Sequence, residues 1–555
     1  MPEPSPSGGA HPANGGDLLV AVLREHGVEV VFGVLSVHNM PLVEAVDREL
    51  RFVPVRHEAA AVNAADAHAR AGGGLGVALT STGTGAGNAA GSLIEAQSGG
   101  AAVLHVTGQI DSRHLGLGRG VIHETRDQAG MLRAVSKHAA TVLPGADAGA
   151  ILRHAAARAL SVPCGPASVE WPIDLQYAAH PLDGPVCPPV PPPPADPGQV
   201  AAAAHLLAAA RRPVIWAGGG ARGARTELRA LAERLGAPVL TSNAGRGTIP
   251  EDHPQVVGNF AAGPAGRELL GRADLLLSVG THFRSNETAD HTIPVPSRHV
   301  QIDVDGRAIG RVFPATAGVA GDAAEVLAAL LDSLDRTGEA AADSGWRDAG
   351  IDARRRARAG LRAAIGPYAV ICDAIRARLD RRSVVARDVT IPSSQWGNRL
   401  LEIYDPATNV FPLGGGIGQG LAMGIGAALA TPDVPALIIA GDGGLAVHLG
   451  ELGTLAQERP WAVLVVFNDG GYGVLRNMQD AGGAPRSGVD LVAPDFAALA
   501  AAYDLPFRRV TRAAEFPAAL DESLAGGGPA VVEVDVRAIG PAPVPFTPPV
   551  TAPGR

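Results

Sequence analysis

The pattern of apolar runs along the chain predicts strands that alternate with helices. Short runs such as Gly76–Thr80, Leu275–Val279 and Ala462–Phe467 have the length and near-continuous hydrophobicity of strands buried on both faces. Between such runs lie segments with apolar residues at helical spacing, such as Ala59–Arg70. This alternation is typical of parallel sheets whose crossovers are helical, so we predict an α/β fold.

Chain length and two interruptions of this pattern predict several domains. At 555 residues the chain is too long for one hydrophobic core. A proline-rich stretch that includes Pro191–Pro194 is typical of an extended linker. We expect a disordered tail at 1–16, an N-terminal domain at 17–180, a linker at 181–198, a central domain at 199–334, a connecting segment at 335–366, a C-terminal domain at 367–540 and a tail at 541–555. Each domain is expected to be a doubly wound parallel sheet.

Composition excludes some classes of function. A net charge of −9 gives no support for nucleic-acid binding. The first 16 residues have neither a basic start nor an apolar centre, as a secretory signal would. No uninterrupted apolar run has the length of a membrane span. We therefore expect a cytoplasmic protein without a nucleic-acid or membrane partner.

A glycine-flanked aspartate follows one of the apolar strands. Ala436–Ala440 leads into Gly441–Gly444, and 24 residues separate Gly443 from Asn468, which ends the next strand. One helical crossover fits in that interval, so Asp442 and Asn468 return to the same sheet edge. The glycines leave room for phosphate oxygens beside the backbone, and Mg²⁺ prefers oxygen ligands. An ordinary Gly/Asp turn is the alternative, but the spacing favours a magnesium diphosphate site.

These motifs, with Arg56–Ala61 and Leu413–Gly424, resemble the thiamine-diphosphate enzymes of the acetolactate synthase, pyruvate oxidase and benzoylformate decarboxylase type. The resemblance covers about Gly16–Val536. It implies a pyrimidine-binding domain, a central domain and a diphosphate-binding domain, with thiamine diphosphate and Mg²⁺ as cofactors. The central domain binds FAD in some relatives; no clear flavin site is evident here, and none is predicted.

The resemblance assigns the metal ligands and a catalytic acid. It implies that the side chains of Asp442 and Asn468 and the carbonyl of Gly470 bind Mg²⁺. Glu58 stands where the family has a glutamate that hydrogen-bonds the aminopyrimidine ring and promotes loss of the thiazolium C2 proton. The alternative for Glu58 is an acid that interacts with a helix dipole. The family places the two motifs on neighbouring subunits, which implies a homodimer or homotetramer.

Two glycine-rich loops complete the expected cofactor site. Ile417 matches the family's bulky residue that wedges between the two cofactor rings. Gly415 and Gly416 lie beside it, and the backbone near Gly415 is expected to face the aminopyrimidine. A glycine-rich packing helix is the alternative. In the first domain, Gly83 and Asn88 belong to a loop that resembles the family's segment near the pyrimidine.

Three polar residues are expected on the substrate side. Gln109 matches a glutamine near the substrate in acetolactate synthases. His38 and His123 stand where relatives place polar active-site residues, and a neutral imidazole there could move protons to or from a carbonyl oxygen. The alternative for both histidines is a structural or solvated role.

The sequence therefore predicts an acetolactate-synthase-like carboligase. It would act on a 2-oxo acid through a C2-carbanion/enamine intermediate and join the fragment to an aldehyde or ketone acceptor. The alternative is a decarboxylase or C–C lyase of the benzoylformate decarboxylase type, in which the intermediate is protonated. A third hypothesis, a catalytically silent regulatory subunit, is disfavoured because Glu58, Asp442 and Asn468 are all present.

Overall fold

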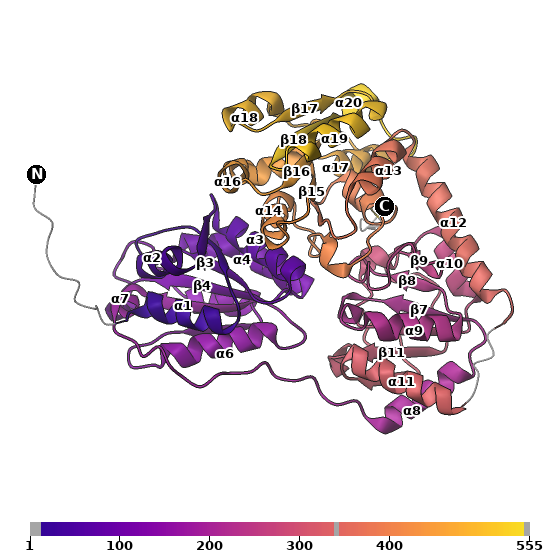
Figure 1. The fold of residues 1–555 in the computed structure, drawn as a ribbon, viewed down its shortest axis with the longest axis horizontal. Coiled ribbons are helices and arrows are strands. Elements are labelled where there is room, and N and C mark those ends of the chain that lie inside the picture. Colours follow the sequence, from indigo (N-terminus) through magenta and orange to yellow (C-terminus); the bar gives the residue numbers. More distant parts are fainter. Residues whose placement is uncertain (1–12, 338–342, 549–555) are drawn as a thin grey trace, which may run out of the picture. The chain divides into compact units, whose positions relative to one another are not determined.

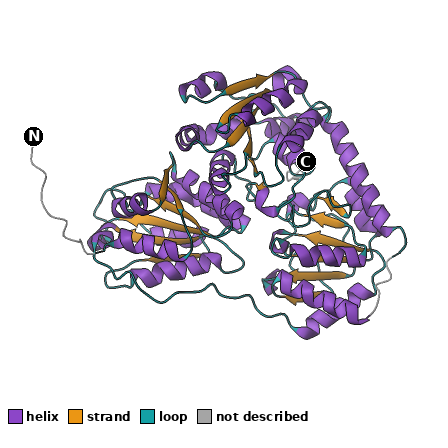
Figure 2. Ribbon diagram, in the orientation of Figure 1, coloured by secondary structure: helices purple, strands orange, loops and turns teal. Residues whose placement is uncertain are grey.

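The computed structural model describes residues 13–337 and 343–548. The chain forms two compact units, one up to residue 190 and one from residue 191, with the short stretches 70–73 and 98–100 grouped with the second. The first unit contains one sheet and the second contains two, each of six strands (Figure 1). Helices flank the strands of every sheet (Figure 2), and all strand pairings are parallel. The predicted α/β fold with three doubly wound parallel sheets is confirmed.

The first sheet has the strand order β2-β1-β3-β4-β6-β5. Its strands are β1 Val30–Gly33, β2 Arg51–Pro54, β3 Gly76–Thr80, β4 Val103–Gln109, β5 His138–Thr141 and β6 Ala167–Pro172. Its helices are α1 Gly15–Glu25, α2 Met40–Glu49, α3 Glu58–Gly72, α4 Thr84–Gly99, α5 Gln128–Val135, α6 Ala148–Leu160 and α7 Ile173–Tyr177. The strand order reverses direction between β1 and β3. Ligands of open α/β sheets bind beyond the carboxyl ends of the strands at such a switch point.

Helix α1 begins inside the segment 1–16 that was expected to be a disordered tail. Asn14 caps the helix, because its side chain accepts hydrogen bonds from the backbone N–H groups of Gly16 and Asp17. Gly15 and Gly16 are buried. Residues 13–16 are therefore part of the folded unit, while residues 1–12, and 549–555 of the expected tail at 541–555, lie outside the described residues.

The central sheet has the order β12-β11-β10-β7-β8-β9. Its strands are β7 Pro213–Ala217, β8 Val239–Thr241, β9 Val256–Gly258, β10 Leu275–Val279, β11 His299–Asp303 and β12 Ala317–Ala320. Its helices are α8 Pro197–Ala208, α9 Arg225–Leu235, α10 Pro264–Arg272 and α11 Ala323–Thr337. Every residue of β7 and β10 is buried, which explains the unbroken apolar runs of the sequence.

The third sheet has the order β14-β13-β15-β16-β18-β17, with its switch point between β13 and β15. Its strands are β13 Val385–Arg387, β14 Asn409–Val410, β15 Ala436–Gly441, β16 Ala462–Asn468, β17 Phe507–Val510 and β18 Ala530–Asp535. Its helices are α12 Trp346–Ile365, α13 Tyr368–Arg378, α14 Gly420–Ala430, α15 Asp442–Leu445, α16 Leu452–Glu458, α17 Gly473–Ala481, α18 Phe496–Ala502, α19 Phe516–Ala525 and α20 Val536–Ile539.

The two interruptions of the sequence pattern differ in structure. Residues 178–196 contain no helix or strand, whereas 197 and 198, the last two residues of the linker expected at 181–198, belong to α8. In the expected connecting segment at 335–366, α12 occupies 346–365 and buries Trp346 and Ile365 in the core of the second unit. Among the described residues, no helix combines the length and apolar character that a membrane crossing needs.

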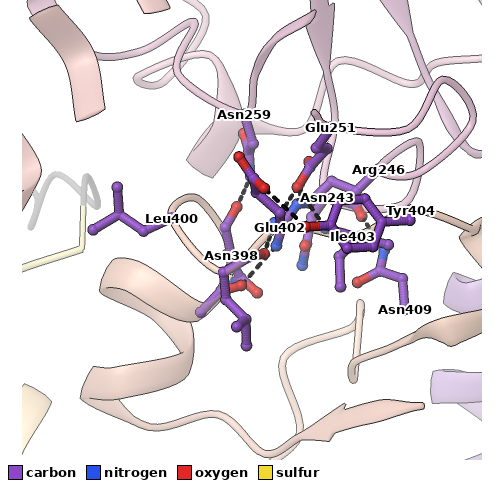
Figure 3. Close-up of polar contacts among 12 residues, drawn as sticks. Asn243, Arg246, Glu251, Asn259, Asn398, Leu400, Glu402, Ile403, Tyr404 and Asn409 are labelled. Carbon is purple, nitrogen blue, oxygen red and sulfur yellow. Dashed lines mark hydrogen bonds and ion pairs between the residues drawn. The ribbon is translucent and has the colours of Figure 1, made fainter. Parts of the chain in front are cut away.

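A buried ion pair joins the central sheet to the third sheet within the second unit (Figure 3). The guanidinium of Arg246 donates to both carboxylate oxygens of Glu251, at 2.8 and 2.7 Å. It also donates to the carbonyls of Gly397, at 2.6 Å, and Leu401. Both charged side chains are almost fully buried. The pair thereby fixes the backbone of the segment 397–401.

Candidate active site

The metal motif lies at the carboxyl edge of the third sheet. Strands β15 and β16 pair in parallel register with Gly441 opposite Phe467. Asp442 and Asn468, the residues that come next, therefore lie side by side at the ends of adjacent strands, as the length of the crossover predicts. Asp442 begins the short helix α15 directly beside the switch point.

Asp442 has an unsatisfied carboxylate oxygen. Its side chain is 3% exposed, and its Oδ1 accepts the backbone N–H of Asp469 at 3.1 Å. Oδ2 is buried and has no hydrogen-bond partner among the described residues. Burial raises the pKa of Asp442, while backbone N–H groups oppose that shift. A buried carboxylate oxygen without a partner is costly, and a divalent cation would satisfy it.

The other two expected ligands differ in their surroundings. The side chain of Asn468 is half-buried, and its amide NH₂ donates to Glu533 at 2.8 Å. The carbonyl of Gly470 already accepts the N–H of Leu491 at 3.0 Å and the guanidinium of Arg476 at 3.1 Å. A cation can use this carbonyl only if it displaces one of these donors, so the role of Gly470 stays a prediction.

Asp469 adds a second carboxylate to this edge. Its Oδ1 is buried, accepts no hydrogen bond and lies 3.9 Å from the guanidinium of Arg476. Burial and the neighbouring carboxylate of Asp442 raise the pKa of Asp469 to about 6. No group of three or more His, Cys, Asp or Glu side chains within 13–337 and 343–548 could hold a metal ion. The remaining ligands of a cation at Asp442 would be amide, carbonyl, phosphate or water oxygens.

Close backbone contacts explain the glycines of the motif. A Cβ on Gly443 would lie 2.7 Å from the carbonyl oxygen of Gly471, and one on Gly444 would lie 3.0 Å from a carboxylate oxygen of Asp388. On Gly441 it would lie 2.6 Å from the hydroxyl of Thr390. Packing against Gly471, Asp388 and Thr390 therefore requires glycine at these positions, and contact of this backbone with a diphosphate stays a prediction.

The glycine-rich loop that contains the expected wedge residue, Ile417, lies beside this edge. Gly415 and Gly418 have φ angles of +90° and +82°, which favour glycine. Between them, Gly416 is half-buried and Ile417 is 40% exposed. Ile417 also lines the cavity described below, so its side chain is available for contact with a ring of the cofactor.

Asp388, which sequence reasoning missed, organises this loop. It follows β13, and its carboxylate accepts the backbone N–H of Gly418 at 3.0 Å and of Val389 at 2.7 Å. Burial raises the pKa of Asp388 to about 7. An aspartate directly after β13, whose pairing with β15 sets it at the same sheet edge as Asp442, is the sequence signal that could have identified it.

A cavity of about 820 Å³ in the second unit connects these features. Gly415, Ile417 and residues 441–444 line one part of it. Another part is lined by polar residues that include Asn243, Asn259, Glu287, Asn398 and Arg399. The close-up of Figure 3 places Asn243, Asn259 and Asn398 beside the buried Arg246–Glu251 pair. The cavity is large enough for a cofactor fragment and a small substrate.

The first unit gathers its own set of predicted residues at the carboxyl ends of β1 to β4. Glu58 is the first residue of α3, and the amide of Asn88 donates to its carboxylate at 3.0 Å. A Cβ on Gly85 would lie 2.8 Å from the same carboxylate. Gly83, with φ of +61°, opens this loop. The predicted loop and the predicted acid therefore lie in direct contact.

His38 and His123 form a pair at the same edge. Their ring centroids are 5.3 Å apart, and the rings are nearly perpendicular. Burial, and then the neighbouring His123, lower the pKa of His38. His123 has a φ of +66°, and its carbonyl oxygen would lie 2.5 Å from a Cβ on Gly83. The pair therefore adjoins the loop that contacts Glu58.

Gln109 is part of a buried hydrogen-bond network. Its amide oxygen accepts the hydroxyl of Thr82 at 3.2 Å, and its NH₂ donates to Glu170 at 3.1 Å. Gln128 also donates to Glu170, at 3.1 Å, and accepts the N–H of Gly83 at 2.7 Å. The amide of Gln109 thus contributes to holding the Thr82–Gly83 loop; a contact with substrate stays a prediction.

Comparison with protein families covers all three sheets. The thiamine pyrophosphate enzyme N-terminal TPP binding domain matches residues 13–131, the central domain matches 200–330, and the C-terminal TPP binding domain matches 392–534. The chain belongs to the thiamine pyrophosphate enzyme family. The family resemblance predicted from the motifs is confirmed, and so is an enzyme that forms or cleaves C–C bonds with this cofactor.

Curated relatives of the family align over most of the chain. A probable 2-ketoarginine decarboxylase, AruI, of Pseudomonas aeruginosa is 33% identical over 89% of this chain and 89% of its own length. The acetolactate synthase large subunit of Parasynechococcus marenigrum is 31% identical over 94% and 88%. A probable acetolactate synthase large subunit of Methanococcus aeolicus is 27% identical over 92% and 90%. The relatives thus include both reaction types considered from the sequence.

The residues of this family member fit its cofactor. The unsatisfied oxygen of Asp442 suits a cation, and Gly443 and Gly444 line the cavity beside it, where a diphosphate would lie. Ile417 is exposed at the cavity, where it could separate the two rings. In the first unit, the carboxylate of Glu58 accepts a hydrogen bond from Asn88, and its contact with the aminopyrimidine stays a prediction.

Proposed function

We propose that the protein is a thiamine-diphosphate- and Mg²⁺-dependent decarboxylase that converts a 2-oxo acid to an aldehyde and CO₂. The observation that supports this reaction best is the His38–His123 pair beside the Glu58 loop. Decarboxylation without ligation requires that a proton be delivered to the carbon that loses CO₂. Imidazoles near neutral pH are suited to that transfer. Burial lowers the pKa of His38, which favours its neutral form, able to accept a proton.

The remaining site residues have supporting roles in this proposal. Asp442 and Asn468 hold Mg²⁺, and the backbone at Gly443 receives the diphosphate. Ile417 supports the rings of the cofactor, and Glu58 shares a proton with its aminopyrimidine nitrogen. The bound cofactor supplies a nucleophilic carbon that can accept the electrons of the cleaved C–C bond. The protein supplies position and proton transfer.

The similar 2-ketoarginine decarboxylase supports this reaction type and suggests the first substrate to test. The second candidate is the carboligase predicted from the sequence, which the similar acetolactate synthases favour. In that case an aldehyde or ketone acceptor would bind near Val474 and Leu475, which line the cavity. The two reactions differ in the fate of the same fragment, so product analysis separates them.

The experiment uses the protein loaded with thiamine diphosphate and Mg²⁺. Pyruvate, 2-oxobutyrate, benzoylformate and 2-ketoarginine are supplied one at a time, and CO₂ release and product mass are measured. We expect one aldehyde per CO₂ from at least one substrate. An acyloin or acetohydroxy acid as the main product from every substrate would reject the decarboxylase in favour of the carboligase.

A variant pair tests the proton-transfer role. His123→Gln should lower aldehyde formation by about 10²-fold or more, the usual contribution of general acid–base catalysis. His154→Gln is the matched control, because His138 and His154 form a similar ring pair, with centroids 5.0 Å apart, elsewhere in the first unit. Equal losses in the two variants would contradict a specific role for His123.

We also propose that the active form is a homodimer or homotetramer. Support comes from the family resemblance, in which the glutamate and the metal motif act from neighbouring subunits. A mixture of Glu58→Gln and Asp442→Ala chains, denatured and refolded together, should then regain part of the activity that each lacks alone. Light scattering gives the assembly size, and full activity of a monomer would contradict the proposal.

A further inference from the structure

Glu533 is a buried acid on β18 to which the proposed function gives no role. We propose that Glu533 is a positioning residue for the metal site, which fixes the side-chain amide of Asn468 so that its oxygen is presented to the cation. This inference rests on the proposed function, in which Asn468 is a ligand of Mg²⁺. It concerns which end of the amide the cation meets.

The hydrogen bond between these two residues decides the orientation of the amide. Asn468 Nδ2 donates to Glu533 Oε1 at 2.8 Å. A carboxylate can only accept hydrogen bonds, so it must face the NH₂ end of the amide. The amide oxygen therefore points away from Glu533. If the amide turned over, oxygen would meet oxygen at Glu533, and N–H donors would face the cation.

Glu533 is itself held in place from its other side. Arg509, on the neighbouring strand β17, donates from Nε to Glu533 Oε2 at 2.8 Å. The strand pairing sets Arg509 opposite Glu533, and Glu533 opposite Val466, two residues before Asn468. The Glu533 side chain is 4% exposed, whereas that of Arg509 is 46% exposed. Both carboxylate oxygens are thus engaged, and the carboxylate cannot rotate without loss of a hydrogen bond.

The consequence for the metal follows from the chemistry of its ligands. Mg²⁺ accepts oxygen donors in a strict geometry, and an amide presents its oxygen from one end only. Loss of the partner that orients a metal ligand commonly reduces metal affinity by about 10- to 100-fold. Glu533→Gln keeps the size of the side chain but can donate as well as accept. It therefore removes the preference for one orientation of Asn468.

The test measures metal affinity in the presence of thiamine diphosphate. Mg²⁺ is titrated by calorimetry and Mn²⁺ by electron paramagnetic resonance. Glu533→Gln should raise the dissociation constant by about 10- to 100-fold, and saturating Mg²⁺ should restore most of kcat. Glu522→Gln is the control. Glu522 accepts a hydrogen bond from Arg508, which lies next to Arg509 on β17, but the Glu522 side chain is exposed. This variant should bind metal as the wild type does.

Asn468→Ala separates this inference from the function on which it rests. Unchanged metal affinity in Asn468→Ala would reject the metal assignment itself. Weaker binding in Asn468→Ala, together with a dissociation constant within twofold of wild type in Glu533→Gln, would overturn the role of Glu533 alone. If Glu533→Gln does not fold, Arg509→Gln releases one oxygen of Glu533 from a more exposed position. It should also weaken binding of Mn²⁺, and no change there would equally overturn the proposal.

Discussion

The buried pair of Arg246 and Glu251 gives the most direct prediction about stability near the cavity. The substitution Glu251→Gln removes the negative charge but retains the shape of the side chain. Arg246, which is fully buried, would keep its carbonyl acceptors at Gly397 and Leu401 but lose its counter-charge. The segment that these carbonyls fix includes Asn398, which lines the cavity. Stability and the shape of the cavity should therefore change together.

The magnitude follows from burial. Removal of one partner of a buried ion pair costs about 3–5 kcal/mol, because the remaining charge is desolvated and unpaired. At about 2–4 °C per kcal/mol for a unit of a few hundred residues, the melting temperature should fall by at least about 6 °C. The double variant Arg246→Met/Glu251→Leu should melt closer to wild type, since replacement of both charges by apolar groups is often neutral.

Differential scanning calorimetry measures these differences. The matched control is Asp252→Asn, at the residue after Glu251. It breaks an exposed ion pair with Arg381, in which nitrogen and oxygen are 2.7 Å apart. Exposed pairs contribute about 1 kcal/mol or less, so this variant should melt within about 4 °C of wild type, by the same conversion. The reasoning would be refuted if Glu251→Gln and Asp252→Asn melted at the same temperature.

Two further predictions concern the cofactor site and pH. Gly443→Ala should weaken thiamine diphosphate binding at least about tenfold (about 1.4 kcal/mol), because its Cβ would lie 2.7 Å from a backbone oxygen. The control is Gly360→Ala, because no atom lies within 4 Å of a Cβ at that position. Equal affinities of the two variants for the cofactor, measured by calorimetry, would contradict this prediction. Burial lowers the pKa of His105 from 6.5 to about 4, so below about pH 6.5 the unfolded state binds more protons than the folded state. Between pH 6.5 and 4 the free energy of unfolding of the wild type should fall by about 3 kcal/mol more than that of His105→Gln. Melting temperatures measured across this pH range test the difference, and parallel pH profiles of the two proteins would contradict it.

The sequence was sufficient to predict the sheets and the main edge of the site. Buried parallel strands are nearly continuous apolar runs, so β10 was predicted at its observed bounds. The interval between Asp442 and Asn468 fits one crossover, so the sequence alone predicts that they lie on adjacent strands, as observed. The Ala- and Arg-rich stretch around Arg354–Arg356 was expected to be a helix with a solvated face, and α12 is that helix; its packing into the core through Trp346 and Ile365 was not predicted, because its buried positions are few.

The parts of the site that were missed depend on contacts between distant segments. The position of Asp388 after β13 is visible in the sequence, but its hydrogen bond to the N–H of Gly418, 30 residues away, is a property of the fold. The same holds for Glu533, 65 residues from Asn468. The sequence also could not indicate that Arg476 already occupies the carbonyl of Gly470, because the fold of the loop after β16 decides that contact.

The central claim is that Glu58 activates a thiamine diphosphate held at Asp442 and Asn468. The most direct test is the rate of deuterium exchange at the C2–H of the bound cofactor, measured by NMR after acid quench, in wild type and Glu58→Gln. We expect exchange to be about 10²- to 10⁴-fold slower in Glu58→Gln, while its affinity for the cofactor is retained. In the control Glu44→Gln, at an exposed position of α2, the exchange rate should equal that of wild type. Exchange in Glu58→Gln as fast as in wild type would contradict it.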